Sequence, residues 1–403
     1  MAEPVSKIMK MPERPPVVDW ATDFDHLHPS WAEDPYSIWR ELRDTCPVAH
    51  TDRFSGVYFP LRYDDIRAVA YDTEKFSSRR VVIREGRPDS VLPPITSDPP
   101  AHRDHRKILL SSFTPEAVAR LEPRTRSICG DTLRRLSGRT ECDIAVDYAQ
   151  QIPTRVIACM LGLPEQHADM FRRWIHEITR GFADPEIGRR VGSEMNAFFA
   201  DHVARRRKTP GDDAVGQLIE ARLNGQPLSD EHIIGTFRLL LVAGINTTWS
   251  MIGASLWHLA THEDDRKRLV AEPQLIPAAI EEFLRAYSPA VVGRVIEKET
   301  EIGGCPVKAG EMVMLAYGAA DRDPAVFADP DRVIIDRAEN RHAAFGLGIH
   351  RCIGANLARM EIRVAIEEWL RTFPDFTLSP GAVVEWSPGS VRGPLQVPVT
   401  IRR

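Results

Sequence analysis

The clearest chemical signal is a single cysteine in a glycine-punctuated stretch, residues 345–354. Gly346 and Gly348 allow backbone turns that a Cβ disfavours, and from Ala355 a helix-forming run follows with apolar residues at helical spacing. We therefore expect Cys352 near the start of a helix, where unpaired N–H groups and the helix dipole stabilise a thiolate. A thiolate binds metal or acts as a nucleophile, and the alternative is an ordinary buried cysteine.

The spacing of this stretch favours a metal ligand. It reads Phe-Gly-x-Gly-x-His-x-Cys-x-Gly and resembles the haem-binding loop of the cytochrome P-450 family, in which a cysteine thiolate is the proximal iron ligand. The resemblance implies that Cys352 binds the iron of a haem b. It also implies that Phe345, Gly346 and Gly354 belong to the cofactor-binding loop.

A second stretch, residues 243–248, lies in a long apolar helix pattern. Gly244 either lets a flat cofactor or a diatomic ligand approach the backbone, or it serves a helix-packing contact, since a mid-helix glycine costs about 1 kcal/mol relative to alanine. Thr247 can donate to a carbonyl one turn back and so open a local bulge. Beside the cysteine loop, Ala243, Gly244 and Thr247 resemble the oxygen-activation segment of the same family.

One residue of that segment departs from the family pattern. Asn246 stands where the family usually has Asp or Glu. An amide cannot titrate, so it can only hold water or substrate by hydrogen bonds. Proton delivery to bound oxygen must then run through Thr247, through water or through another group.

A haem also has two propionates, which need donors. His102 and Arg106 are four residues apart, so they share one face of a helix that begins near Pro100, and an Arg fork matches a carboxylate. The resemblance places Arg294 and His350 at the other propionate positions. Each of these residues alone is more often a surface charge or a core histidine.

The pair Glu282 and Arg285 shares a helix face because the two residues are three positions apart. One interpretation is an exposed ion pair, worth less than about 1 kcal/mol. The other is the family's buried Glu-x-x-Arg pair, which supports the cysteine loop. Its third partner is then Arg332 or Arg337.

Composition narrows the possible functions. The chain has 403 residues and a net charge of -5, which gives no electrostatic support for nucleic-acid binding. No apolar run reaches membrane-spanning length, and the N-terminal residues lack the apolar core of a signal peptide. The six cysteines are scattered without zinc or redox spacing, as in a reducing cytosol. We expect a cytoplasmic protein without a membrane or nucleic-acid partner.

The periodicity predicts a mainly α protein with a smaller β region. Helices are expected from Ser229-Asp230 to about His262 and over about 275–287, and strands are expected near 291–296, 311–315 and along the tail, 383–401. The resemblance implies the cytochrome P-450 fold, with haem between the long central helix and the helix after Cys352. We expect residues 1–30 to form an N-terminal arm and residues 31–403 a single catalytic domain.

The resemblance implies a haem-thiolate monooxygenase that inserts one oxygen atom from O2 into a C–H bond, by hydroxylation or oxidative dealkylation. Electrons are expected from a separate ferredoxin and an NAD(P)H-dependent reductase. By family position the pocket is mostly apolar, which favours a small or medium hydrophobic substrate. Its expected lining is Trp174, Ile178, Leu239, Val242, Val291, Val292 and Val391.

Two other functions stay open. A haem-thiolate peroxygenase or isomerase is one, because Asn246 interrupts the usual proton relay. A non-enzymatic haem protein that senses or stores a ligand is the other. Four basic residues near the proximal side either dock an acidic redox partner or are ordinary solvated charges: Arg103, Lys107, Arg351 and Arg359.

Overall fold

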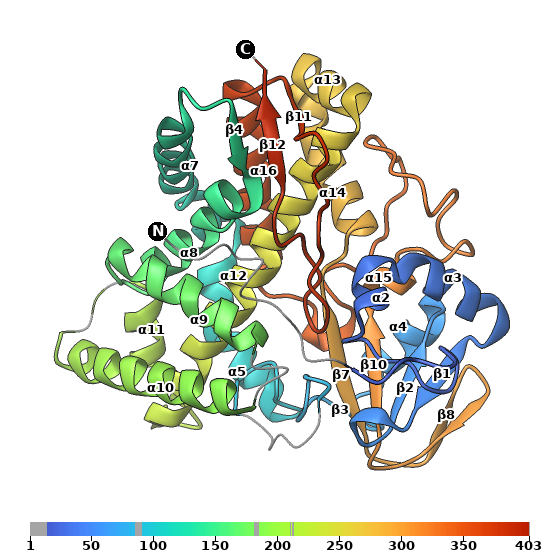
Figure 1. Cartoon of the computed structure of the whole chain (residues 1–403). Helices are drawn as coiled ribbons and strands as arrows, with labels where there is room; N and C mark the ends of the chain where they lie inside the picture. The colour runs from blue at the N-terminus through green and yellow to red at the C-terminus, as the bar shows by residue number, and fades with distance from the viewer. Residues whose placement is uncertain (1–13, 85–90, 181–184, 210, 212, 403) are drawn as a thin grey trace.

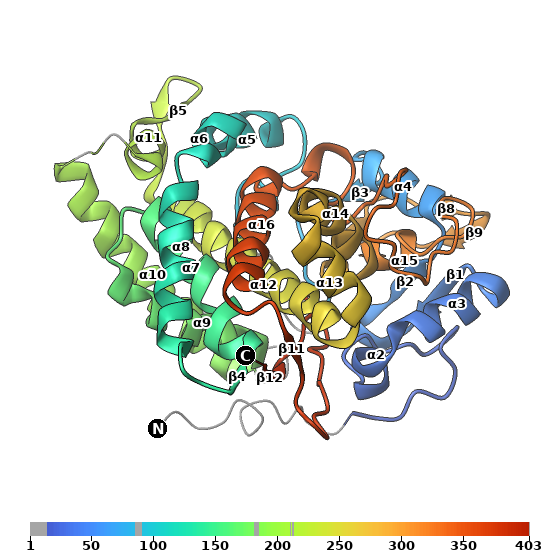
Figure 2. The same ribbon diagram turned by 90° about the horizontal axis from the view of Figure 1, so that it is seen from above.

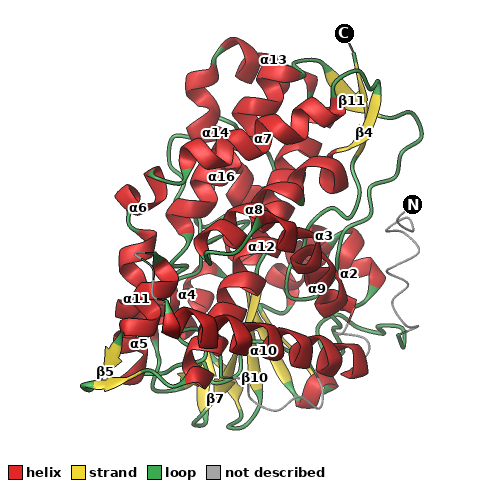
Figure 3. Cartoon of the chain, turned by 90° about the vertical axis from the view of Figure 1, so that its left-hand side faces the viewer, coloured by secondary structure: helices red, strands yellow, loops and turns green. Residues whose placement is uncertain are grey.

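The computed structural model describes residues 14–402, apart from 85–90, 181–184, 210 and 212. Helices dominate the described chain; β7 and β10 lie at the lower end of the view in Figure 3, and β4 and β11 lie near the C-terminus. The helices are α2 (Pro29–Glu33), α3 (Pro35–Thr45), α4 (Tyr63–Tyr71), α5 (Ala101–Leu110), α6 (Pro115–Ala119), α7 (Glu122–Leu136), α8 (Gln151–Met160), α9 (Ala168–Arg180), α10 (Pro185–Lys208), α11 (Ala214–Glu220), α12 (Asp230–Thr261), α13 (Glu263–Ala271), α14 (Ile276–Ala286), α15 (Tyr317–Ala320) and α16 (Ala355–Thr372). This distribution confirms the expected mainly α class with a smaller β region.

The strands form one five-stranded sheet and three smaller ones. The large sheet has the order β1 (Val48–Thr51), β2 (Val57–Pro60), β10 (Met312–Ala316), β7 (Val291–Ile296) and β3 (Phe76–Ser77). β10 runs parallel to β2 and antiparallel to β7. The smaller sheets are β11 (Phe376–Leu378) with β12 (Pro398–Ile401) and β4 (Glu141–Asp143), β5 (Arg222–Leu223) with β6 (Gln226–Pro227), and β8 (Thr300–Ile302) with β9 (Cys305–Val307).

The long helix α12 crosses the middle of the body, with α16 packed against it (Figures 1 and 2). The Ser229 hydroxyl accepts from the backbone N–H of His232 and caps the first turn, and His262 ends the helix, as the sequence predicts. By length and composition α12 resembles a membrane-spanning helix, yet 61% of its apolar window is buried against the rest of the chain. It is therefore placed as the core helix of a globular body.

Local sequence signals account for several element boundaries. The Asp34 side chain accepts from the backbone N–H groups of Tyr36 and Ser37 and starts α3, as expected of an Asp-Pro N-terminus. Asn224 and Gly225 have φ values of 53° and 79°, the left-handed pair that a tight hairpin needs. That pair joins β5 to β6.

The tail differs from the expected run of strands over 383–401. Only Pro398–Ile401 forms a strand. The preceding segment touches the body through isolated bridges, Ala290 with Val391 and Trp386 with Pro394. Prolines and glycines interrupt it, and proline cannot donate to a ladder, so it folds as a loop.

The described part of the expected N-terminal arm packs onto the large sheet. Phe24 is fully buried, and its ring lies 6.3 Å from that of Trp31 and 5.7 Å from that of Phe59. Arg53, beside β2, donates to Asp23 at 2.7 Å and to Asp25 at 3.1 Å. These contacts tie the segment to the body through both apolar packing and charge.

We expect Phe24→Ala to lower the free energy of unfolding by about 3 kcal/mol, because a fully buried phenyl ring is replaced by a cavity. Urea titration followed by circular dichroism measures this. Val18→Ala is the matched control in the same segment, since Val18 is 89% exposed and its loss should be silent. A silent Phe24→Ala would show that the arm adds nothing to the stability of the domain.

Candidate functional site

The cysteine loop is shaped by two left-handed glycines, Gly346 (φ 75°) and Gly348 (φ 69°). The Cys352 N–H donates to the Phe345 carbonyl at 2.7 Å and closes the loop. An added Cβ at Gly348 would lie 2.2 Å from the carbonyl oxygen of Ala70 in α4. The loop therefore needs glycine there for both conformation and space.

Cys352 lies three residues before α16, with an accessible side chain. The packing around the sulfur raises the pKa of its thiol, whereas the Gly354 N–H and the charges of Arg106, Arg351 and Arg359 pull that pKa down. The thiols of the buried Cys129 and Cys142 have pKa values of about 12. Cys352 thus combines access with cationic surroundings, and a bound metal removes the thiol proton outright.

Four basic residues gather beside this loop, from α5, β7 and the loop itself. The rings of His102 and His350 lie 4.3 Å apart, and each Nε2 is buried without a partner. Burial lowers the pKa of His350 to about 2, and the nearby Arg294, His102 and Arg106 add to the effect. Arg294 is 4% exposed and donates to the Gly293 carbonyl at 2.7 Å.

No carboxylate among the described residues hydrogen-bonds to His102, Arg294 or His350. Buried donors and a buried guanidinium without a counter-ion are costly. A planar cofactor with a metal for Cys352 and carboxylates for the basic cluster would satisfy all of them. The residues therefore fit a haem.

Arg106 has a different contact from its three basic neighbours. Its Nη2 donates to the carbonyl of Arg351 at 2.7 Å, so the guanidinium holds the backbone one residue before Cys352. The structure thus brings together all four residues that the sequence assigns to the propionates. Arg106 also links α5 to the cysteine loop through this hydrogen bond.

An accessible stripe runs along the middle of α12. Ala243 is exposed although it lies at the centre of a core helix, and Leu239, Asn246 and Thr247 are partly exposed. The Thr247 hydroxyl donates to the Ala243 carbonyl at 2.7 Å, as expected of a threonine that bonds one turn back. Spacing of four residues puts Leu239, Ala243 and Thr247 on one face.

The buried pair Glu282 and Arg285 holds the segment that precedes the cysteine loop. Two hydrogen bonds of 2.8 Å join the carboxylate to the guanidinium, and both side chains are fully buried, so this is no exposed ion pair. The third partner is Arg337, whose Nε donates to Glu282 at 2.9 Å. Arg332 offers only its backbone carbonyl, which accepts from Arg285 at 2.8 Å.

Comparison with known proteins agrees with this geometry. The family model for cytochrome P-450 matches residues 185–387. The mycinamicin IV hydroxylase/epoxidase of Micromonospora griseorubida is 35% identical over 89% of this chain and 94% of its own length. The steroid C26-monooxygenase of Mycolicibacterium smegmatis is 33% identical over 90% and 91%. The crystal structure of CYP109E1 from Bacillus megaterium with testosterone superposes with a TM-score of 0.86 at 30% identity, over 93% of this chain and 100% of that one.

The chain belongs to the cytochrome P-450 family. Its fold is the cytochrome P-450 fold, as the structural neighbours show. It is an oxidoreductase of the monooxygenase class, and the family's cofactor is haem b with an axial cysteine thiolate.

Two residues of this P-450 lie elsewhere than the sequence suggested. A Cβ at Gly244 would meet the Ile157 side chain of α8 at 2.9 Å, so Gly244 faces a helix contact and fits the packing alternative. Trp174 is 2% exposed; it stacks on Phe171 and donates to Glu194 at 2.9 Å. It belongs to the interface of α9 with α10, because the more apolar face of α9 turns inward there.

The other expected pocket residues are more accessible, apart from Val291, which is 9% exposed. The N–H of Val291 donates to the Ser390 carbonyl at 2.9 Å, and Ala290 pairs with Val391. The start of β7 and the tail loop therefore meet, as the expected pocket requires. Partly exposed positions are Ile178, Leu239, Val242, Val292 and Val391.

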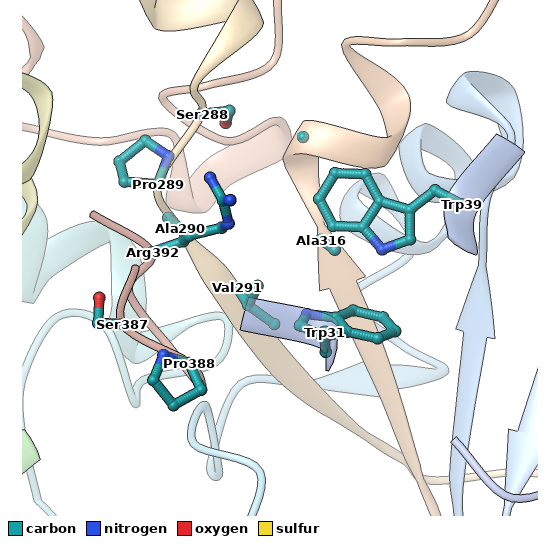
Figure 4. A pocket seen from close by; sticks show the side chains of 12 residues that line it. Trp31, Trp39, Ser288, Pro289, Ala290, Val291, Ala316, Ser387, Pro388 and Arg392 are labelled. Atoms are coloured by element: carbon teal, nitrogen blue, oxygen red, sulfur yellow. The ribbon is translucent and has the colours of Figure 1, made fainter. Parts of the chain in front are cut away.

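Two cavities flank this region. The first, of about 10 Å³, holds at most one water and lies between Trp39, Val291 and Arg392 (Figure 4). The second, of about 210 Å³, lies between the loop after β3, α5 and α12. His105 lines it with His232 and forms a hydrogen bond with Ser97 at 2.8 Å.

We expect Gly348→Ala to lower haem content and thermal stability, because the new Cβ is strained at a positive φ and collides with the backbone of α4. The ratio of Soret to protein absorbance and a thermal melt measure this. Gly310→Ala is the control outside the loop, since Gly310 also has a positive φ of 89° but nothing lies within 4 Å of its added Cβ. Equal losses in both variants would contradict the steric argument.

Proposed function

We propose that this P-450 inserts one oxygen atom from O2 into a C–H bond of a small or medium hydrophobic substrate, by hydroxylation or oxidative dealkylation. The observation that supports this most is the accessible Cys352 beside a buried basic cluster without a carboxylate partner. A haem b held there supplies the reductive activation of O2. The protein supplies binding, orientation and exclusion of water.

The residues proposed to bind the haem have different roles. Cys352 binds the iron, and the loop residues Phe345, Gly346 and Gly354 shape its surroundings. His102, Arg294 and His350 provide donors for the propionates, and Arg106 links that cluster to the loop through the Arg351 carbonyl. Each assignment rests on the family pattern together with the unpaired state of the two imidazoles.

In this proposal, Thr247 and Asn246 orient the water that carries protons beside α12. The hydrogen of the Thr247 hydroxyl is used by the Ala243 carbonyl, so the oxygen remains free to accept from a water. Asn246 can donate and accept but cannot ionise. Protons therefore arrive through ordered water held by Thr247, and Ala243 leaves room for that water beside the helix.

The apolar character of Leu239, Val242, Val291, Val292 and Val391 supports a hydrophobic substrate. Relatives named for a steroid and for testosterone binding fit this class. Electrons come from a separate ferredoxin and an NAD(P)H-dependent reductase, since the six cysteines lack iron–sulfur spacing. We place the reaction in the cytoplasm.

A peroxygenase or isomerase is the second candidate, because Asn246 replaces an acid in the oxygen-activation segment. Turnover with ferredoxin, reductase and O2, compared with turnover on peroxide alone, separates the two. A substrate-induced spin shift without turnover in either condition would favour a ligand sensor. A difference-spectrum screen of small aromatics, terpenes and fatty acids selects the substrate for these assays.

We expect Cys352→Ser to abolish the thiolate-type Soret band of the reduced carbonyl complex, because an alcohol does not replace the thiolate donor. Cys159→Ser is the control, since Cys159 is exposed but lies on α8, outside the loop. Reduced carbonyl spectra of both variants provide the comparison. A thiolate-type band that persists in Cys352→Ser would refute the assignment of the ligand.

We expect Thr247→Ala to release more hydrogen peroxide and to lower product per NAD(P)H several-fold, because the water acceptor on α12 is lost. Thr248→Ala is the neighbouring control, since Thr248 lies on the buried side of the helix. Product, peroxide and NAD(P)H are measured together in one assay. Unchanged coupling in Thr247→Ala would remove this residue from the proton route.

A further inference from the structure

Arg359 and His342 lie against the ring of Phe345 and both bind Glu281. We call Glu281, His342 and Arg359 the Phe345 collar. Arg359 binds Glu281 through two hydrogen bonds of 2.6 and 2.7 Å. His342 contacts the same carboxylate at 3.0 Å. The Arg359 guanidinium lies over the Phe345 ring, 4.4 Å from its centroid. Arg359 is thus paired with Glu281, although 31% of its side chain stays exposed.

Within the collar the Glu281 carboxylate forms an ion pair with the Arg359 guanidinium. The carboxylate is held ionised: burial alone would raise the pKa of Glu281, but Arg359 and His342 lower it to about 2. The Ala344 N–H donates to His342 Nδ1 at 3.2 Å, which leaves His342 Nε2 to donate to Glu281. Glu281 therefore balances the Arg359 guanidinium.

The collar reaches Cys352 through one residue. The Phe345 carbonyl accepts from the Cys352 N–H at 2.7 Å, while the ring of the same residue carries Arg359 on its face. A change in the collar can act on the sulfur by moving that backbone bond or by changing the local field. The field route is long-ranged, because a partly buried charge is poorly screened.

We propose that Glu281 is a positioning residue that sets the reduction potential of the iron held by Cys352, by neutralising Arg359 and holding it on Phe345. The inference rests on the ligand assignment proposed above. An unbalanced positive charge favours the ferrous state, which carries one more electron. An unbalanced negative charge favours the ferric state.

The test is a double-mutant cycle read by redox titration of the substrate-free holoenzyme. We expect Glu281→Gln to shift the potential to more positive values, Arg359→Gln to more negative values, and the double variant to return close to the wild type. A several-fold change in the ferrous-to-ferric ratio is the expected size; a tenfold change equals 59 mV for a one-electron couple. Glu281→Asp, which keeps the charge, should stay near the wild type.

The matched control is Glu122→Gln. Glu122 pairs with Arg363 at 2.5 Å, one turn beyond Arg359 on the same helix, so the same charge is removed farther from the cysteine loop. An equal shift in this control, or no shift in Glu281→Gln and Arg359→Gln, would overturn the proposal. If Glu281→Gln does not bind haem, the direction of the potential shift in Arg359→Gln alone still tests the proposal.

The spectrum of the reduced carbonyl complex distinguishes a failure of the Glu281 proposal from a failure of the Cys352 ligand assignment. A thiolate-type Soret band in each variant shows that Cys352 ligation is intact, so an unshifted potential would then refute only the role of the collar. A wild-type protein without that band would instead refute the ligand assignment. A lower melting temperature with an unchanged potential would show a structural role only, and so would also count against the proposal.

Discussion

The fully buried carboxylate of Glu282 is the interaction on which the cysteine side of the molecule depends. It accepts from both ends of the Arg285 fork, from Arg337, from the Ile334 N–H and from the Asn340 amide. Arg285 in turn donates to three backbone carbonyls of the segment between β10 and the cysteine loop. The pair therefore fixes a long irregular segment that has few ladder hydrogen bonds of its own. Removing one partner of such a network leaves an uncompensated buried charge, which is far more costly than losing the whole network.

Two adjacent acids on α14 use this arrangement differently. Glu282 points into the core and anchors the segment before the loop. Glu281 points to Arg359 on α16 and to His342, which lies three residues before Phe345. One turn of one helix thus holds the segment before the loop through Glu282 and pairs Arg359 through Glu281. The structural role and the electrostatic role belong to neighbouring positions, so they can be separated by mutation.

Much of this site could be predicted from sequence because its signals are local. The glycine-flanked cysteine, the Ser229 cap of α12 and the Thr247 hydroxyl bond depend on residues close in the chain. Tertiary partners decided the rest. The direction of Gly244 depends on Ile157 in α8, and the choice between Arg332 and Arg337 depends on how an irregular segment folds back.

Other features had no distinctive sequence pattern. Trp174 reads as a pocket residue or as an interhelical residue until α10 is placed beside α9. Glu281 was overlooked because two consecutive acids give no sign of which partner each will meet. The sequence favours strands along the tail, but its prolines prevent a continuous ladder.

The cysteine side of the site and the α12 side differ in their charged residues. Beside the cysteine, every full charge in the collar has a partner, and the basic cluster lacks only the carboxylates of the cofactor. Along α12 the accessible stripe has no titratable group between Leu239 and Thr247. Thr247 offers an acceptor and Asn246 offers both a donor and an acceptor, so the pair can orient water but cannot store a proton. We propose that proton supply on that side depends on ordered water, whereas the charges around Phe345 set the potential of the iron.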